Sequence, residues 1–217
     1  MNKIFLNTHY TFQSGTGEIE MGRCITSYNV VITTDEDCPE DIKEVGFAKF
    51  DIINLSQGRE FGYSSMMLFE HSHSLMELGF AIYNFDEDNF RDEILNYYQD
   101  EFNFYGCICY LDRIEILPAF RGQAIGKKVL KDIINRFSHG TSLFVLKAFP
   151  LQLEAAISDS LWCNKMKLDE FEKNESKAKQ KLFKYYKSLG FVNILKDQYF
   201  YLNPILKNRK LDEVKLF

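Results

Sequence analysis

The sequence predicts a mixed α/β (α+β) domain, with a mixed central sheet and helices on both of its faces. Runs rich in β-branched and aromatic residues, which suit strands, occur early, in the middle and at the end of the chain. Segments with helical periodicity separate these runs. The 217 residues are 46% hydrophobic and 26% charged, as in soluble globular proteins, and we find no internal repeat or linker. Residues 1–217 are therefore predicted to form a single domain.

The predicted elements follow one another as strands, two helices, strand, helix, strand, helix and two strands. The first helix contains Ser74 and Glu77 at the spacing of a capping box. The clearest helix follows Arg121, because apolar residues line one of its faces and basic residues the other. In chain order the elements are strands at 27–34 and 44–55, helices at 74–85 and 88–102, a strand at 107–118, the helix after Arg121, a strand at 142–149, a helix at about 168–189, and strands at 191–195 and 198–202.

The composition argues against several classes of partner. A formal net charge of −5 provides no basic field that would attract nucleic acid. No segment approaches the roughly 20 continuous apolar residues of a membrane span, and the N-terminus lacks the apolar region of a signal peptide. We therefore expect a cytoplasmic protein with no membrane partner. The odd number of cysteines predicts free thiols. These cysteines are Cys24, Cys38, Cys107, Cys109 and Cys163.

The stretch "LPAFRGQAIGKKVL" leads from a predicted strand into the clearest helix through a turn that contains Gly122 and Gly126. The first N–H groups of a helix lack internal partners and carry the positive end of its dipole. Glycines let a ligand approach the backbone closely, and Arg121 adds a permanent positive charge. The stretch therefore predicts a pyrophosphate-binding turn, although it fits neither the Walker pattern nor the dinucleotide fingerprint. The alternative is a tight connection with two surface lysines.

The same stretch, read from its start as "ILPAFRGQAIGKKVL", resembles the acetyl-CoA signature of the GNAT superfamily of N-acetyltransferases, Q/R-x-x-G-x-G/A. Arg121 takes the first position of that signature, Ala124 stands at the middle glycine and Gly126 takes the last position. Ala124 departs from the pattern, because it places a methyl group where the backbone would approach the pyrophosphate. We expect binding to survive this change with some loss of affinity.

A second motif lies downstream in the order that the family requires. "YYKSLGF" (185–191) is similar to the family's F-Y-x-x-L-G-F segment, which ends the helix beside the sulfur of the cofactor. The two motifs define a predicted acetyl-CoA-binding core at 107–203. Residues 1–106 contain no matched motif and would form the acceptor side.

The resemblance implies a mostly antiparallel GNAT-like sheet and direct transfer of an acetyl group from acetyl-CoA, with no metal, to a primary amine. The acceptor would be an amine on a small molecule or on a protein. The pantetheine arm would lie along the backbone of Glu115, Ile116 and Leu117, and the pyrophosphate would bind the turn. The residues implied in cofactor binding are Ile116, Leu117, Arg121, Gly122, Gln123, Ala124, Ile125, Gly126 and Lys127.

Three residues are candidates for catalysis. Tyr186 matches the family's tyrosine near the sulfur, where its phenol would donate a proton to the departing thiolate. The alternative role for Tyr186 is packing at a helix end. Asp112 occupies a position where many relatives have a carboxylate that contacts the amine. The period of a strand places Asp112 and Glu115 on opposite faces unless a bulge intervenes, and both could be solvated strand residues. The choice of general base among Asp112, Glu115 and a chain of waters stays open.

A catalytically silent acyl-CoA-binding sensor or interaction module is the alternative function, and Ala124 leaves room for it. A different phosphate ligand at the same turn is disfavoured by the second motif. His71 and His73 are read as a polar loop before a helix rather than as metal ligands. The acidic run at 84–93 is read as a solvated helix start or as a rim that attracts a cationic acceptor. The segment at 163–180 is read as an exposed helical extension. The oligomeric state stays open, with a homodimer as one arrangement.

Overall fold

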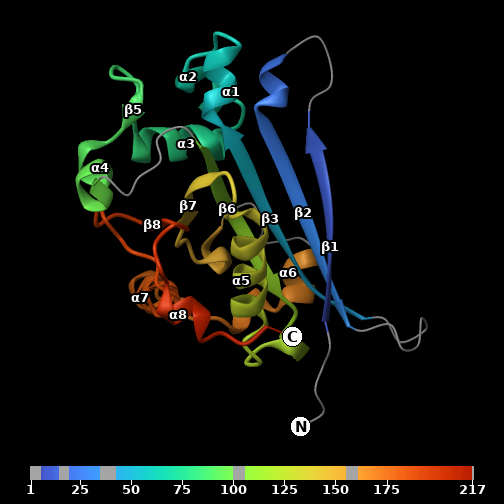
Figure 1. Ribbon diagram of the computed structural model, residues 1–217. Helices are drawn as coiled ribbons and strands as arrows, with labels where there is room; N and C mark the ends of the chain where they lie inside the picture. Colours follow the sequence, from blue (N-terminus) through green and yellow to red (C-terminus); the bar gives the residue numbers. More distant parts are fainter. Residues whose placement is uncertain (1–5, 15–19, 35–42, 100–105, 155–160, 217) are drawn as a thin grey trace.

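The central sheet has six strands, numbered along the chain. They are β1 (Leu6–Ser14), β2 (Ile25–Thr34), β3 (Glu44–Asn54), β6 (Cys107–Ile116), β7 (Thr141–Lys147) and β8 (Tyr199–Leu202). Their order across the sheet is β1-β2-β3-β6-β7-β8, and every neighbouring pair is antiparallel except β6 and β7 (Figure 1). The computed structural model describes residues 6–14, 20–34, 43–99, 106–154 and 161–216. The prediction of a mixed, mostly antiparallel sheet is confirmed.

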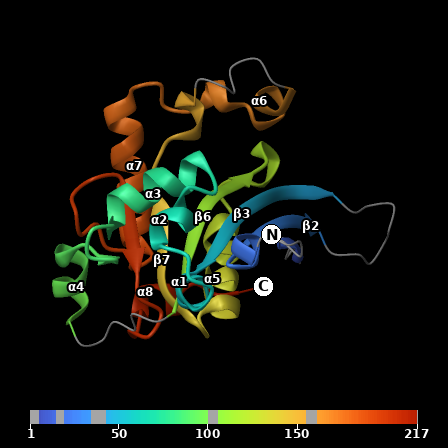
Figure 2. The same ribbon diagram turned by 90° about the horizontal axis from the view of Figure 1, so that it is seen from above.

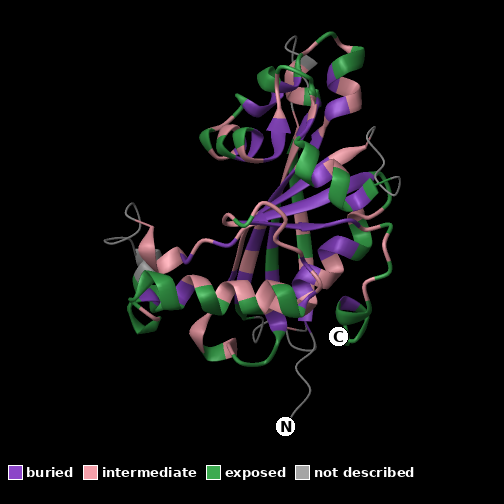
Figure 3. Cartoon of the chain, turned by 90° about the vertical axis from the view of Figure 1, so that its left-hand side faces the viewer, coloured by how far each residue is buried: buried purple, intermediate pink, exposed green. Residues whose placement is uncertain are grey.

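Helices cover both faces of this sheet. The helices are α1 (Leu55–Glu60), α2 (Ser65–Phe69), α3 (His73–Ile82), α4 (Asp92–Tyr98), α5 (Ile125–Phe137), α6 (Leu161–Met166), α7 (Glu175–Ser188) and α8 (Arg209–Asp212). Apolar residues of α5, α7 and α8 pack on one face, and those of α1 to α4 pack on the other. The central strands are largely buried, whereas the outward sides of the helices are exposed (Figure 3). Helices on both faces are therefore also confirmed.

The amphipathic pattern of α5 explains why this helix lies in the centre of its face. Val129, Leu130 and Ile133 are fully buried against the sheet. Beside them, the rings of Tyr28 and Phe50 stack with their centroids 4.8 Å apart. The aromatic-rich composition thus supplies much of the core between α5 and the sheet.

Several element boundaries differ from the predictions. The strand β1 was not predicted, because it is polar and mostly exposed as the edge of the sheet. The helix predicted at 74–85 begins at His73, and its N-cap is Ser72 rather than Ser74, because the Ser72 hydroxyl accepts from the N–H of Leu75. The helix predicted at 88–102 is limited to α4, since the residues before it form a two-stranded hairpin of β4 (Tyr83–Asn84) and β5 (Asn89–Phe90).

The region after β7 departs most from the sequence-based reading. The predicted helix at 168–189 starts only at Glu175, where Asn174 provides the N-cap. The segment at 163–180 is not a uniformly exposed helical extension, because Met166 and Leu168 are buried. In Figure 2, α6 and α7 lie at the same side of the molecule. The strand predicted at 191–195 is reduced to one bridge, between Val192 and Tyr201 of β8.

Two further expectations concern membranes and cysteines. Within the described segments, no helix combines the length and the apolar character needed to cross a bilayer. Cys24, Cys107 and Cys109 form no disulfide within the described residues. Cys38 lies outside the described residues, and so does the side chain of Cys163.

Candidate functional site

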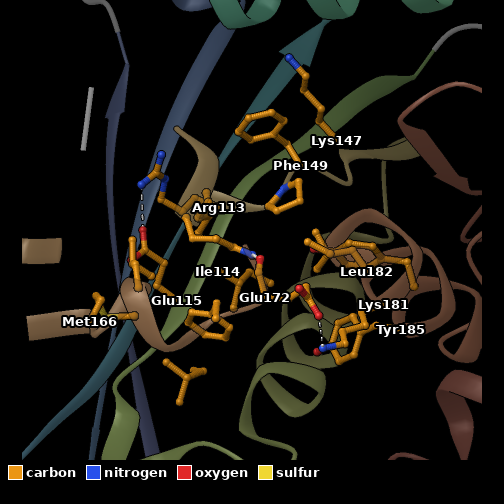
Figure 4. A pocket seen from close by; sticks show the side chains of 18 of the residues that line it. Arg113, Ile114, Glu115, Lys147, Phe149, Met166, Glu172, Lys181, Leu182 and Tyr185 are labelled. Atoms are coloured by element: carbon orange, nitrogen blue, oxygen red, sulfur yellow. Dashed lines mark hydrogen bonds and ion pairs between the residues drawn. The ribbon is translucent and has the colours of Figure 1, made fainter. Parts of the chain in front are cut away.

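A cavity of about 500 Å³ opens where β6 and β7 part. These two parallel strands are paired from Cys107 and Thr141 as far as Leu111 and Leu146. Beyond that point, residues 112–116 of β6 form one wall of the cavity. Side chains of α7 form the opposite wall, and residues before α6 and from its end onward, among them Phe149 and Met166, also line it (Figure 4). The cavity therefore connects the two faces of the sheet.

A bulge in β6 determines which side chains meet in this cavity. The register between β3 and β6 slips by one residue, so that Asp112 is the extra residue opposite β3. Lys49 of β3 is paired with Arg113 in the register, and its Nζ also lies 3.6 Å from Asp112 Oδ2. Asp112 and Arg113 therefore both lie on the face of the sheet that bears Lys49. Arg113 in turn binds Glu115, two residues further along the strand. The bulge thus places Asp112 and Glu115 on the same face, and their expected separation onto opposite faces does not occur.

Glu115 is held by an ion pair on the cavity wall. Its side chain is 1% exposed, and its Oε1 accepts from Arg113 Nη1 at 2.9 Å. Arg113 Nη2 also donates to Glu154 Oε2 at 2.5 Å, which ties the loop after β7 to β6. This buried carboxylate is already engaged by Arg113. Asp112, with 25% of its side chain exposed, is the more accessible of the two candidate bases.

The turn before α5 presents a row of unpaired backbone N–H groups. The backbone is left-handed at Gly122, with φ +78°, and at Ala124, with φ +59°. The first helical hydrogen bonds run from the N–H groups of Lys127 and Lys128 to the carbonyl of Ala124. The five N–H groups of residues 122–126 have no acceptor among the described residues. They form a concentration of donors at the positive end of the helix dipole, which suits an anion.

Arg121 does not point at this turn. Its Nε donates to the carbonyl of Ile116 at 2.9 Å, its Nη2 donates to the carbonyl of Met166, and its guanidinium stacks 4.4 Å from the ring centre of Phe171. Burial lowers the pKa of Arg121 from its usual value. The N–H of Leu117 is also engaged, with the carbonyl of Val45 at 2.8 Å. Arg121 therefore braces the cavity wall, and the turn itself offers the anion backbone donors.

The two sequence motifs meet at the start of α5. A Cβ added to Gly126 would lie 3.2 Å from the hydroxyl of Tyr185 on α7. Lys127 extends over the ring of Tyr185, with its Nζ 5.6 Å from the ring centre. Ile125 is buried beneath the turn and anchors the helix, whereas Gln123 is exposed beside the unpaired donors. The fold thus brings the glycine turn and the second motif to opposite sides of one narrow gap.

Tyr186 lines the cavity with its hydroxyl free of partners within the described chain. Its ring packs against Phe191 and Phe200, with centroid distances of 6.2 and 5.9 Å. Burial raises the pKa of Tyr186 to about 12. The phenol therefore keeps its proton at neutral pH and is able to donate it into the cavity.

One buried acidic residue beside this site was missed by sequence reasoning. Asp51 of β3 is only 7% exposed, and its Oδ1 accepts from Ser27 Oγ at 2.5 Å. Burial raises the pKa of Asp51 above the usual value of a carboxyl. A signal was present in the sequence, because Asp51 is an acid within the apolar run "FAKFDIINL". Its significance depends on its cross-strand neighbours, which the sequence does not show.

The remaining candidates lie elsewhere. His73 is exposed at the start of α3, and no group of three or more metal-ligating side chains occurs among the residues that the structure describes. Within the acidic run at 84–93, Asp88 accepts from Ser65 Oγ at 2.5 Å and from Arg59 Nε at 3.2 Å. These bonds fix the β4–β5 hairpin, so only the last acids of the run belong to a helix start.

Replacing Ala124 with glycine is expected to raise the free energy of unfolding by about 0.5–1 kcal/mol. The left-handed backbone costs a residue with a Cβ about 1–2 kcal/mol, and the greater freedom of glycine in the unfolded chain offsets about 0.4–1 kcal/mol of the gain. Urea denaturation of the variant and the wild type measures the difference. The mirror substitution Gly122→Ala serves as a control and should lower the free energy of unfolding. A less stable Ala124→Gly variant would contradict the expected strain.

Comparisons with protein-family models, with curated proteins and with solved structures find no match to this chain.

Proposed function

We propose that this chain is an acetyl-CoA-dependent N-acetyltransferase of the GNAT type that acts on a primary amine. One observation carries the proposal: the cavity at the point where β6 and β7 part is lined by Tyr185 and Tyr186, and the Tyr185 hydroxyl lies beside Gly126, at the end of the turn that presents unpaired N–H donors. The two sequence motifs, read independently of the fold, lie on either side of this cavity. A site for a CoA thioester requires two such motifs close together, because the phosphates and the sulfur of the cofactor need separate binding groups.

The donor would be held by the backbone. The N–H groups of residues 122–126 would bind the pyrophosphate, since they are unpaired and lie at the helix N-terminus. The cavity between residues 112–116 and α7 would enclose the pantetheine arm. Its apolar walls include Ile114 and Leu182, and they would exclude water from the thioester. The carbonyl of Ile116 is bound by Arg121, so a hydrogen bond from the arm to that group requires Arg121 to move.

The catalytic groups come from opposite faces of the sheet. Tyr186 enters from the α7 face, and we assign it the role of donating its phenolic proton to the departing thiolate. Asp112 enters from the other face, and we assign it the contact with the acceptor ammonium. Glu115 is assigned a structural role, because it is buried and paired with Arg113. Acetyl-CoA and the acceptor amine would therefore enter from different faces of the sheet and meet at the thioester.

Gly126→Trp is the variant that tests the cofactor site. The indole would fill the gap to Tyr185 and cover the backbone donors, so we expect the affinity for acetyl-CoA to fall by at least about 30-fold, or about 2 kcal/mol. Calorimetric titration of acetyl-CoA measures this change. Asn135→Trp is a matched control, because it adds the same side chain at an exposed position of the same helix, away from the turn.

Turnover separates the enzyme from the silent module. Release of the CoA thiol is followed in the presence of butylamine, tyramine, spermidine and a peptide with a free N-terminus. Binding together with amine-dependent thiol release supports the enzyme, and binding without release supports an acyl-CoA-binding module. If the folded wild-type protein does not bind acetyl-CoA, both functions are wrong.

A further inference from the structure

A row of polar side chains crosses three strands on the face of the sheet that bears Asp112. Ser27 of β2, Asp51 of β3 and Tyr110 of β6 are directly opposite one another in the register. Asp51 lies at the centre of this row and is 7% exposed. Lys49 and Asp112 occupy the adjacent row of the same face, where they form an ion pair. Asp51 is therefore a neighbour of the residue that we assign to the acceptor amine.

Asp51 is buried without a counter-ion. Within the described part of the chain, its side chain accepts a hydrogen bond from the Ser27 hydroxyl and forms no ion pair. The nearest basic group on β3, Lys49, is bonded to Asp112 instead. Burying a carboxylate without a cation is costly, so such a group is rarely kept for packing alone. The titratable or charged groups that surround Asp51 on its own face are Lys49, His71, Tyr110 and Asp112, and the thiol of Cys109 lies on the other face of the neighbouring strand.

We propose that Asp51 is the positioning residue that takes up the proton of the acceptor ammonium, acting through Asp112 at the cavity wall. This inference rests on the proposed acetyl transfer. Asp51 does not line the cavity, so Asp112 holds the ammonium. The proton passes from the ammonium through Asp112 to the carboxylate of Asp51. The Ser27 hydroxyl fixes the orientation of that carboxylate. The acceptor is therefore a cationic primary amine that approaches from the face opposite α5.

The proposed step balances as follows. The ammonium loses one proton to Asp51, and the lone pair of the resulting amine forms a C–N bond with the acetyl carbon. The C–S bond breaks, and Tyr186 gives its proton to the thiolate. The second proton of the nitrogen returns to Tyr186, and Asp51 releases its proton to solvent. The products are an amide, a free thiol and one proton.

The electrostatics of Asp51 suit this role. Burial is the main cause that raises its pKa, and the negative charge of Asp112 raises it further, while Ser27 and Lys49 lower it. A carboxylate with a raised pKa is a better proton acceptor at neutral pH than an ordinary surface aspartate. Activity should therefore be lost as the pH falls through the pKa of Asp51, because protonated Asp51 cannot accept a proton.

Asp51→Asn tests the proposal, because asparagine keeps the shape of the side chain and an oxygen for Ser27. With the amine panel above, we expect kcat to fall by about 10- to 100-fold while acetyl-CoA binding changes by less than about two-fold. The acidic limb of the pH–rate profile should disappear, and formate should partly restore the rate of Asp51→Ala. Asp132→Asn is the matched control, since Asp132 also accepts from hydroxyls, of Thr8 and Tyr10, but lies on α5. Its pH profile should match that of the wild type.

The outcomes separate this proposal from the proposed function. If Asp51→Asn keeps the wild-type rate and acidic limb, the role of Asp51 is wrong and the acetyltransferase stands. If the wild type binds acetyl-CoA but acetylates no amine, the acetyltransferase is wrong and the role of Asp51 falls with it. Carboxyl NMR titration provides a readout that does not need activity. It should show a raised pKa for Asp51 that decreases in Asp112→Asn, and an ordinary pKa for Asp51 would overturn the proposal.

Discussion

Replacing Tyr186 with phenylalanine is expected to lower kcat by about 100- to 1000-fold, while the affinity for acetyl-CoA changes by less than about two-fold. The substitution removes only the hydroxyl, which has no partner among the described residues. The ring contacts with Phe191 and Phe200 remain, so the fold and the cavity wall are preserved. The loss would therefore fall on the step in which the thiolate departs. Initial rates of thiol release, together with calorimetric titration of acetyl-CoA, measure the two quantities separately.

Tyr185→Phe is the natural control for this experiment. Tyr185 is adjacent in sequence and also lines the cavity, but its hydroxyl faces Gly126, at the end proposed to bind the phosphates. We expect its loss to affect acetyl-CoA affinity more than kcat. At any pH below about 12, the wild-type rate should show no decrease caused by deprotonation of Tyr186, because the phenol is protonated there. If Tyr186→Phe retains the wild-type kcat, the thiolate leaves without this acid, and Tyr186 serves as packing at the helix end.

The parts of the site that the sequence predicts are those with local signals. The turn at 117–126 is recognisable because a strand, glycines and an amphipathic helix follow one another within a few residues. The second motif at 185–191 is likewise continuous in the chain. The two motifs are far apart in the chain, but each has its own local pattern. The parallel pairing of β6 and β7 brings them together in the fold.

The grouping of Asp51, Asp112 and Glu115 on one face of the sheet could not be predicted in the same way. The alternation of β6 suggests opposite faces for Asp112 and Glu115, and one extra residue in the register reverses that conclusion. Whether a strand contains a bulge depends on its partner, here β3. The same is true of Asp51, because its burial and its bond with Ser27 arise from pairing between β2 and β3. These features follow from tertiary structure, and no window of sequence contains them.

The segment between β7 and α7 illustrates a second limit. Its many charges predict an exposed helix, but tertiary contacts override that preference. Met166 and Leu168 are scattered among charged residues and still become buried beside the cavity. Arg121 binds the carbonyl of Met166, and Arg113 binds Glu154. Two partly buried arginines thus hold a segment whose own sequence favours a different structure.

Replacing Gly46 with alanine is expected to lower the free energy of unfolding by about 3 kcal/mol, the largest stability effect that we predict. Gly46 of β3 pairs with Ile116 of β6, and a Cβ at this position would lie 2.1 Å from the carbonyl oxygen of Glu115. The obstructing atoms belong to the backbone, so no side chain can rotate away. The strands must separate, and their hydrogen bonds weaken. Urea denaturation measures the loss.

Gly62→Ala is the control that separates a clash from backbone strain. Gly62 has φ +78° and no atom within 4 Å of an added Cβ, so its substitution should cost only about 1–2 kcal/mol. A cost for Gly46→Ala no greater than that of Gly62→Ala would show that β3 and β6 have room to spare. Otherwise the displaced backbone at Glu115 and Ile116 moves the wall of the cavity. Acetyl-CoA affinity should then fall together with stability in Gly46→Ala and stay unchanged in Gly62→Ala, because only the first substitution reaches the cavity.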